Sequence, residues 1–253
     1  MIITQTRITE GLISEALKQP DYPVLNTFHG SHMVGITSPS GTGLASVISG
    51  LAPGSPVLES HASLHSIVQS LIHQETIHAS WGLAAVNTLL NPGSSGPRTR
   101  AQDLIRTLGK ARNVAVIGHF PFVEKMVFEF RNLWVLEKSP GTGDLHENLK
   151  TSVLPRADVV AMTATTLLNG TLAEILHLIP EGAVKIMLGP STPLASTLFD
   201  LGFDYLGGAI VTDPVQAAQG IQQGFAFRHL QGVDVVLLPK SGPARPGSPE
   251  GWA

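Results

Sequence analysis

The chain contains no cysteine among its 253 residues. Disulfides, zinc sites with cysteine ligands and catalysis by a thiolate are therefore excluded. Charged residues make up only 14% and the net charge is −3, so there is no basic footprint for nucleic acid or an anionic membrane. No apolar run reaches the roughly 18 residues that span a bilayer, and no signal-peptide pattern is found in the opening residues MIITQTRITE. We therefore expect a soluble, cytoplasmic protein.

Several common catalytic motifs are also missing. The sequence has no nucleophile elbow, no P-loop and no H-E-x-x-H pattern, so hydrolase and NTPase functions lack support. Hydrophobic residues make up 43% of the chain, which is enough to build one large domain or two modest ones.

The first third of the chain is predicted to be an α+β unit. Residues 24–29 and 33–37 alternate like the strands of a hairpin, with a tight turn between them. A flexible loop is expected at residues 38–43, and Gly43 at its end is a ligand-binding candidate. Helical patterns occupy residues 8–17, 58–72 and 76–90.

A change of pattern after residue 92 indicates a second unit. Small polar residues with proline and glycine at 93–100 form the linker candidate. We predict an α+β domain over residues 1–92, an α/β domain with a mainly parallel, doubly wound sheet over 101–240, each with its own core, and a disordered tail over 241–253. The second domain is expected to contain strands at 113–118, 133–137, 158–162, 184–188, 205–211 and 233–238, and helices at 123–131, 172–179 and 214–223.

Two loops rich in small and hydroxyl residues follow the central strands of this predicted sheet. Ligands of open parallel sheets bind at the carboxyl ends of the strands, so we place the site in these loops. The ligand-binding candidates there are Thr163, Thr165, Thr166, Asn169, Gly189, Pro190, Ser191 and Thr192.

Two threonines in these loops also match helix-capping patterns. Thr171 and Glu174 fit the capping box S/T-x-x-E, so Thr171 is predicted to cap the helix that follows it. Thr192 precedes Pro193, as an N-cap precedes a proline at the first helical position. The free N–H groups of that helix would attract an anionic ligand, unless Thr192 is a plain cap that faces water.

The first strand of the second unit ends in Gly118-His119-Phe120-Pro121, where a dinucleotide-binding fold carries G-x-G-x-x-G. The second and third glycines are missing, so a pyrophosphate could not approach the backbone in the usual way. Glu137 lies 19 residues after Gly118, at the position of a ribose-binding acid. S-adenosylmethionine, which has a ribose and no pyrophosphate, therefore fits better than NAD, unless Glu137 merely faces solvent. Gly118, Phe120, Pro121 and Glu137 are ligand-binding candidates.

Five motifs stand in an order that resembles one known family. They are WGLAAVN at 81–87, VIGHFP at 116–121, LP-x-AD at 154–158, T-x-T-x-L-x-N-x-T at 163–171 and GPSTP at 189–193. This series resembles the "Putative heavy-metal chelation" family over about residues 10–239. The resemblance implies an enolase N-terminal-like domain, then a Rossmann-like domain, with an active site between them. The family pattern does not lead us to expect His61, His65, His73 or His78.

Asn87 and His119 are the candidate catalytic residues. Asn87 lies on a mainly apolar helical stripe, where its amide either serves the core or projects into the cleft between the domains; the resemblance favours the cleft. His119 is a candidate general base or metal ligand, and the alternative is a packing role within its loop. His61 and His65 have the i, i+4 spacing of a shared metal site, but surface histidines would give the same spacing.

The leading hypothesis is a protein that binds or processes a metal chelate or a related anionic small molecule in an interdomain cleft. One alternative is an enzyme that uses a ribose-bearing cofactor such as S-adenosylmethionine, and another is a non-catalytic ligand sensor. A divalent metal ion and S-adenosylmethionine are the cofactors considered. The expected partner is the small molecule or metal chelate, with no nucleic acid and no membrane. A homo-oligomer is compatible with the sequence, which fixes neither the oligomeric state nor the reaction.

Overall fold

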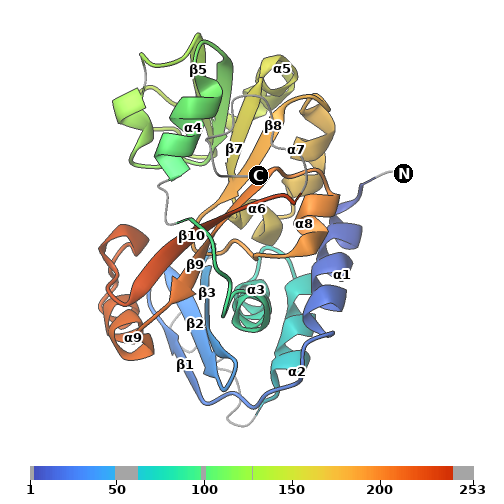
Figure 1. The fold of residues 1–253 in the computed structure, drawn as a ribbon, viewed down its shortest axis with the longest axis vertical. Coiled ribbons are helices and arrows are strands. Elements are labelled where there is room, and N and C mark those ends of the chain that lie inside the picture. Colours follow the sequence, from blue (N-terminus) through green and yellow to red (C-terminus); the bar gives the residue numbers. More distant parts are fainter. Residues whose placement is uncertain (1–2, 49–61, 98–100, 127, 242–253) are drawn as a thin grey trace.

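The computed structural model describes residues 3–48, 62–97, 101–126 and 128–241 (Figure 1). The fold is mixed α/β, with a three-stranded antiparallel sheet and a separate seven-stranded sheet that is mostly parallel. No helix within the described ranges is long and apolar enough to cross a membrane. The predictions for His61, for the start of the 58–72 helix, for the end of the linker and for the tail from residue 242 lie outside the described residues.

The first half of the chain contains the small sheet and the helices that pack on it. Strands β1 and β2 form the predicted hairpin, and the predicted helix at 76–90 is observed as α3. Thr4 caps α1 by accepting the N–H of Arg7, so this helix begins earlier than its apolar pattern suggests. The elements are α1 (Gln5–Ala16), β1 (Asn26–His29), β2 (Met33–Ser38), β3 (Gly41–Ser46), α2 (Leu64–Val68), the 3-10 helix η1 (Gln69–Ile72) and α3 (Ile77–Leu90).

The predicted loop at residues 38–43 is shorter than expected: residues 39–40 form the turn, and residues 41–43 belong to β3, which pairs antiparallel with β2 along its whole length. The glycines that look like loop residues serve packing against α3. A Cβ on Gly43 would lie 2.2 Å from the backbone nitrogen of Thr88 and 2.4 Å from the carbonyl oxygen of Ala84. Glycine at this position therefore lets the strand approach the helix closely.

The second half of the chain forms the large sheet, in the order β10-β9-β8-β7-β4-β5-β6. Every neighbouring pair is parallel except β9 and β10. The strands are β4 (Asn113–Ile117), β5 (Asn132–Glu137), β6 (Leu145–His146), β7 (Val159–Thr163), β8 (Val184–Leu188), β9 (Tyr205–Val211) and β10 (Val233–Pro239). The predicted strands are all present, and the short strand β6 is an addition.

The helices of this half differ more from the expectations. Helix α4 (Ala101–Gly109) was not predicted, and the expected helix at 123–131 is only the 3-10 helix η2 (Val123–Met126). The remaining elements are η3 (Glu147–Leu149), α5 (Lys150–Val153), η4 (Leu154–Arg156), α6 (Thr165–Leu168), α7 (Leu172–Leu178), α8 (Ser196–Asp200), α9 (Pro214–Gln222) and η5 (Phe227–His229).

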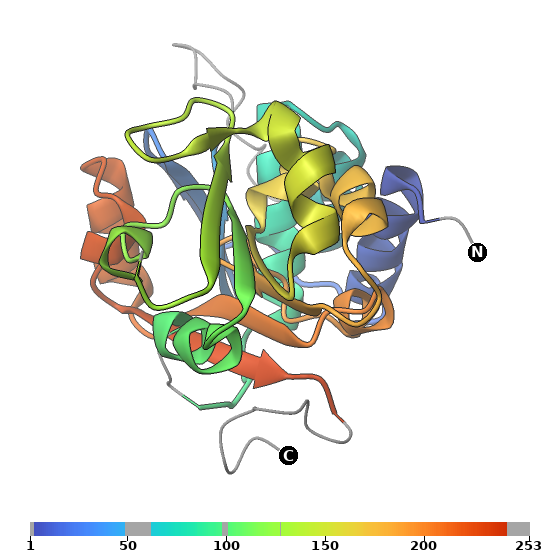
Figure 2. The ribbon, with the colours of Figure 1, turned by 90° about the horizontal axis from the view of Figure 1, so that it is seen from above.

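The two faces of the large sheet are covered by different parts of the chain (Figures 1 and 2). Val114 and Val116 of β4 belong to a buried cluster with Leu104 and Leu108 of α4. Ala115 points to the other face, where a larger cluster contains buried residues of α1, α3 and α7. The expectation of a separate core for each half is therefore wrong, because one apolar cluster joins them.

Glu15 attaches α1 to the start of α8. Its carboxylate accepts the N–H and hydroxyl groups of Ser196 and Thr197 at 2.6–2.8 Å. Burial raises the pKa of Glu15, but the hydrogen bonds from Thr197 and Ser196 outweigh burial, and the pKa lies below the usual 4.5. The charged form is therefore bound more strongly in the folded state than in the unfolded state.

The Glu15→Gln variant is expected to have a free energy of unfolding about 1–3 kcal/mol lower at neutral pH, because it loses hydrogen bonds to a charged group. Since folding lowers the pKa of Glu15, the wild-type advantage is complete above the unfolded pKa and is lost as the pH falls through the folded pKa. Urea denaturation at neutral and acidic pH measures both effects, with Glu10→Gln on an exposed position of α1 as the control. Equal stability of Glu15→Gln and wild type at neutral pH would contradict this role.

Candidate functional site

The large sheet reverses its strand order between β4 and β7. From β4 the chain proceeds to β5 and β6 on one side, and from β7 it proceeds to β8 and β9 on the other. Strands β4 and β7 lie side by side and parallel, with Ile117 opposite Met162. The loops at their carboxyl ends therefore diverge and leave a crevice, which is where open α/β sheets bind their ligands.

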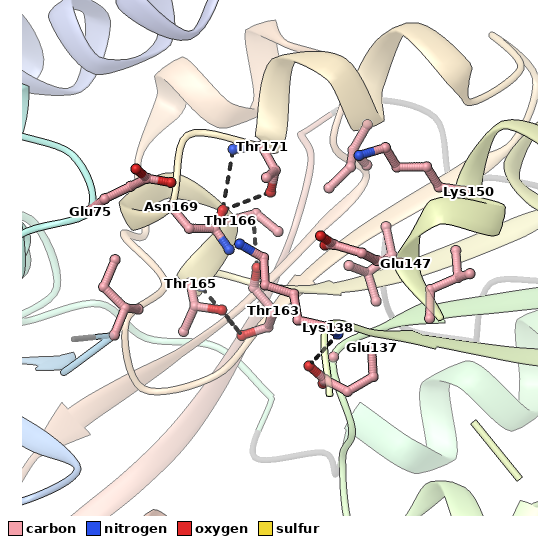
Figure 3. A pocket seen from close by; sticks show the side chains of 15 residues that line it. Glu75, Glu137, Lys138, Glu147, Lys150, Thr163, Thr165, Thr166, Asn169 and Thr171 are labelled. Atoms are coloured by element: carbon pink, nitrogen blue, oxygen red, sulfur yellow. Dashed lines mark hydrogen bonds between the residues drawn. The ribbon is translucent and has the colours of Figure 1, made fainter. Parts of the chain in front are cut away.

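A cavity of about 300 Å³ lies at this crevice, and we call it the switch-point pocket (Figure 3). It is lined by both halves of the chain and by hydroxyl, amide, carboxylate and ammonium groups. Its lining residues are Ile48, Glu75, Ile117, Gly118, Leu136, Glu137, Lys138, Glu147, Lys150, Thr163, Thr165, Thr166, Asn169, Thr171 and Ile175. The sequence candidates Gly118, Glu137, Thr163, Thr165, Thr166 and Asn169 are thus brought together here.

Hydrogen bonds within the loop after β7 hold its polar groups in place. The hydroxyl of Thr166 donates to the carbonyl oxygen of Thr163 at 2.8 Å, and the hydroxyls of Thr163 and Thr165 are 3.1 Å apart. Asn169 Oδ1 accepts both the N–H and the hydroxyl of Thr171, at 3.2 and 2.7 Å. The amide nitrogen of Asn169 is then left on the pocket side, as Figure 3 shows.

The hydrogen bonds of the predicted capping box at Thr171 and Glu174 are not formed. Thr171 does occupy the N-cap position of α7, but its side chain makes no capping hydrogen bond. Its hydroxyl donates to Asn169 instead, and Glu174 forms an ion pair with Lys150 at 2.8 Å. Thr171 therefore supports the pocket wall rather than the helix end.

Charged groups of both signs surround the pocket. Glu137 Oε2 accepts the backbone N–H of His119 and Oε1 accepts that of Lys138, each at 2.8 Å. These two bonds fix the carboxylate at the end of β5, where it lines the pocket. Figure 3 shows the Lys138 side chain extended towards Asn169, with the carboxylate of Glu147 on the neighbouring wall. The pocket therefore places fixed carboxylate acceptors beside a cationic ammonium donor.

Glu75 is the contribution of the first half of the chain, together with Ile48, and sequence reasoning missed it. Its φ of 63° lies in the left-handed region, which is rare for a residue other than glycine. Its N–H donates to the carbonyl oxygen of Leu168 at 2.8 Å, and the adjacent Gln74 amide donates to the Thr9 hydroxyl at 3.1 Å. These contacts hold the strained residue over the pocket. The sequence around Glu75 does not identify it as a pocket residue, because only the fold brings it next to the segment that follows β7.

His119 lies beside the switch-point pocket but is not part of its lining. Its Nδ1 is 3.1 Å from both carboxylate oxygens of Asp144, and its Nε2 is 3.6 Å from Glu124. Among the described residues, no group of three or more His, Cys, Asp or Glu side chains could hold a metal ion. The geometry thus favours the loop-anchoring alternative for His119 over a role as metal ligand or pocket base.

Asn87 and Gly43 were predicted as site residues, but the structure places both in the packing contact between α3 and β3. Asn87 is 0% exposed, and its amide donates to the carbonyl oxygen of Leu44 at 2.7 Å, so it joins α3 to β3 and does not reach a cleft. Gly43 faces the same helix. Their polar or glycine character reflects close contact between α3 and the small sheet, which sequence alone could not distinguish from a ligand contact.

The predicted anion site at Ser191 and Thr192 is also corrected. Helix α8 begins only at Ser196, after Ala195, and Thr192 is 0% exposed. Asn91 holds this loop by donating to Thr192 O and accepting the N–H of Leu194. Ser191 is buried, and its hydroxyl bonds to Ser46. The Pro193 motif therefore builds a buried loop that ties the two halves together, and it exposes no helix N-terminus.

The remaining candidates, Phe120, Pro121, Gly189 and Pro190, line a second cavity of about 560 Å³. We call it the apolar pocket. It shares no lining residue with the switch-point pocket. The loop after β4 separates the two, since Gly118 lines one and Phe120 lines the other.

The fold and the switch-point pocket define a mixed α/β protein with a polar cavity at the carboxyl edge of its large sheet. Residues 100–235 match the sequence profile of the family described as "Putative heavy-metal chelation", and the chain belongs to this family. This result confirms the resemblance seen in the sequence motifs.

Two solved structures share the fold, and each is described as a protein of unknown function. A crystal structure of a family member of unknown function from Desulfitobacterium hafniense is 25% identical, with a TM-score of 0.83 over 93% of this chain and 99% of that one. A second member of unknown function, from Pyrococcus horikoshii, is 19% identical with a TM-score of 0.76, over 94% of this chain and 100% of that one. An uncharacterized protein of Methanocaldococcus jannaschii is 26% identical over 149 residues, which are 55% of this chain and 57% of that protein.

Proposed function

We propose that the protein binds a metal chelate, or a related anionic small molecule, in the switch-point pocket. The observation that carries this proposal is the convergence of Lys138, the Asn169 amide and the threonine hydroxyls on one cavity at the point of strand reversal. The Lys138 ammonium, the Asn169 amide nitrogen and one hydroxyl of the Thr163–Thr165 pair would donate hydrogen bonds to the carboxylate or hydroxyl oxygens of a chelator. The hydroxyls of Thr166 and Thr171 already donate within the loop and line the cavity as acceptors. Glu75 and Glu147 would face the cationic part of the complex.

A preformed chelate fits this donor set better than a bare ion. A protein site for a divalent metal needs several convergent ligands, and the described residues contain no such group. A chelate brings its own ligands, so the protein needs only to recognise its outer oxygens and its charge. The family description supports this choice of ligand.

We also infer that residues 101–240 form a Rossmann-like domain and residues 1–92 an enolase N-terminal-like domain, joined by the linker at 93–100. With β4 counted as strand 1, the large sheet has the order 3-2-1-4-5-6-7. This order matches the dinucleotide-binding order 3-2-1-4-5-6 with one added edge strand. The antiparallel sheet followed by helices supports the assignment of the first domain.

A second candidate function is an enzyme that uses a ribose-bearing cofactor such as S-adenosylmethionine. The observation that favours it is Glu137, which lines the pocket at the end of the second strand of the Rossmann-like order. Ribose-binding acids occupy this position. Each oxygen of Glu137 accepts one N–H and has a further lone pair for a ribose hydroxyl.

Calorimetric titration distinguishes these candidates. The ligands are nickel–citrate, nickel ion alone, citrate alone and S-adenosylmethionine. We expect saturable binding of nickel–citrate at least about tenfold tighter than binding of either component, a difference of about 1.4 kcal/mol. Binding of S-adenosylmethionine, and of none of the other three ligands, would instead support the second candidate. Binding of any of the four ligands without its chemical conversion would indicate a sensor. Failure of all four would contradict both uses of the pocket.

Glu75→Gly is expected to separate binding from stability. Glycine tolerates the left-handed backbone, so relief of strain offsets the entropy cost of glycine and the free energy of unfolding should change by less than about 1 kcal/mol. Loss of the carboxylate should weaken nickel–citrate binding by about tenfold or more. The matched control is Ala111→Gly, at the other described non-glycine residue with positive φ (56°), which lies outside the pocket lining. Equal affinity of Glu75→Gly and wild type would remove Glu75 from the site.

A further inference from the structure

The apolar pocket lies on the α4 face of the large sheet, away from the switch-point pocket. Its floor is formed by Leu188 at the end of β8, Gly207 of β9 and Val235 of β10. Leu188 belongs to the buried cluster under α4, and Phe120 packs against that cluster. A Cβ on Gly189 would meet nothing within 4 Å, so the space above the end of β8 is open.

Aromatic side chains bound this pocket on two sides. The rings of Phe120 and Phe122, in the loop after β4, are stacked with centroids 5.4 Å apart and an interplanar angle of 21°. Phe227 lies in η5, just before β10. Strands β7, β8 and β9 separate β4 from β10 in the sheet, so the aromatic groups approach the floor from different sides. Such walls favour a flat aromatic ligand, because aromatic rings pair by offset stacking or edge-to-face contact.

The polar side chains of the lining are few, and one of them is positively charged. Only Gln102 and Arg228 have polar side chains among the residues that line the pocket. Arg228 Nε donates to His229 at 3.1 Å, and within the described ranges no carboxylate forms an ion pair with Arg228. A guanidinium at the edge of an apolar cavity can pair with a carboxylate or sulfonate on a ligand whose rings are buried.

We propose that the apolar pocket is a second small-molecule site, and that it binds planar aromatic anions. The cavity of about 560 Å³ has the size of known ligand sites, about 300–1,000 Å³, and shares their apolar lining with few polar groups. Because the two pockets have no lining residue in common, this site does not depend on what the switch-point pocket binds.

The test uses 1-anilinonaphthalene-8-sulfonate, an aromatic anion that fluoresces when it is bound in an apolar site, and its uncharged analogue N-phenyl-1-naphthylamine. We expect one saturable sulfonate site per chain. Phe120→Ala should weaken sulfonate binding by about fivefold or more, whereas Phe128→Ala should leave it unchanged, since Phe128 is 99% exposed and lines neither pocket. Arg228→Gln should weaken binding of the sulfonate and not of the neutral analogue, with Arg131→Gln as the exposed control.

Filling the cavity provides the strictest comparison. Ala226→Trp places a large side chain in the pocket wall, and Val215→Trp places one on α9 at a residue that is 65% exposed. Loss of sulfonate binding with the first variant only would support the site. Unchanged binding by a folded Ala226→Trp protein, or several weak equivalent sites, would overturn it. Self-association of wild type that Ala226→Trp abolishes, measured by sedimentation, would assign the surface to a second copy instead. If Ala226→Trp does not fold, the Phe120→Ala and Phe128→Ala pair decides.

Discussion

Gly43→Ala is expected to lower the free energy of unfolding by about 3 kcal/mol or more, at the upper end of the effects of overpacking. The added methyl group would lie 2.2–2.6 Å from backbone atoms of Thr88, Ala84 and Asn87 in α3. Backbone atoms in a helix cannot move aside as a flexible side chain can. Strand β3 and helix α3 would therefore have to separate, which would disrupt the cluster that joins both halves of the chain.

Urea denaturation of Gly43→Ala and Gly182→Ala measures this effect. A Cβ on Gly182 would meet nothing within 4 Å, so the control should change the free energy of unfolding by no more than about 0.5 kcal/mol. Equal stability of the two variants would contradict the close packing of β3 on α3. A stable Gly43→Ala protein with weakened ligand binding would return Gly43 to the ligand-binding residues.

The buried strands of the large sheet could be predicted well from sequence. Strands β8 and β9 have the bounds expected from their mainly apolar sequences, although Lys185 lies within β8, because a strand covered on both faces has little polar alternation to blur its ends. The position of the switch-point pocket was also predictable in outline. Parallel strands place their carboxyl ends together, and the residues after β4, β5 and β7 converge as expected. The loop after β8 was expected at the same place, but Gly189 and Pro190 line the apolar pocket, and Ser191 and Thr192 are buried.

Features that depend on contacts between distant segments were not predictable. Strand β3 begins with Gly41-Thr42-Gly43, which has the composition of a turn, and its role appears only when α3 lies against it. The structural role of Asn87 was not predictable for the same reason, since its hydrogen-bond partner is a carbonyl group of β3. Glu75 could not be found because its place in the pocket depends on the contact between its segment and the loop after β7.

Thr165→Phe is expected to weaken binding in the switch-point pocket by about 100-fold or more, equivalent to about 2.7 kcal/mol. Thr165 is partly exposed at the start of α6 and lines the cavity. A phenyl ring there would occupy much of a space of about 300 Å³ and would also remove the hydroxyl beside Thr163. The control is Thr107→Phe, an exposed position on α4. Thr107→Phe should have a free energy of unfolding within about 1 kcal/mol of wild type, as surface substitutions usually do. Thr165→Phe loses the contact with the Thr163 hydroxyl, so its binding is compared for the folded protein only.

The most direct measurement is calorimetric titration of nickel–citrate into wild type, Thr165→Phe and Phe120→Ala. The first two differ at the switch-point pocket, and the third is changed only in the apolar pocket. We predict one saturable site in wild type and in Phe120→Ala, and its loss in Thr165→Phe. Equal affinity of wild type and a folded Thr165→Phe protein would contradict the assignment of the ligand to the point where the sheet reverses its strand order.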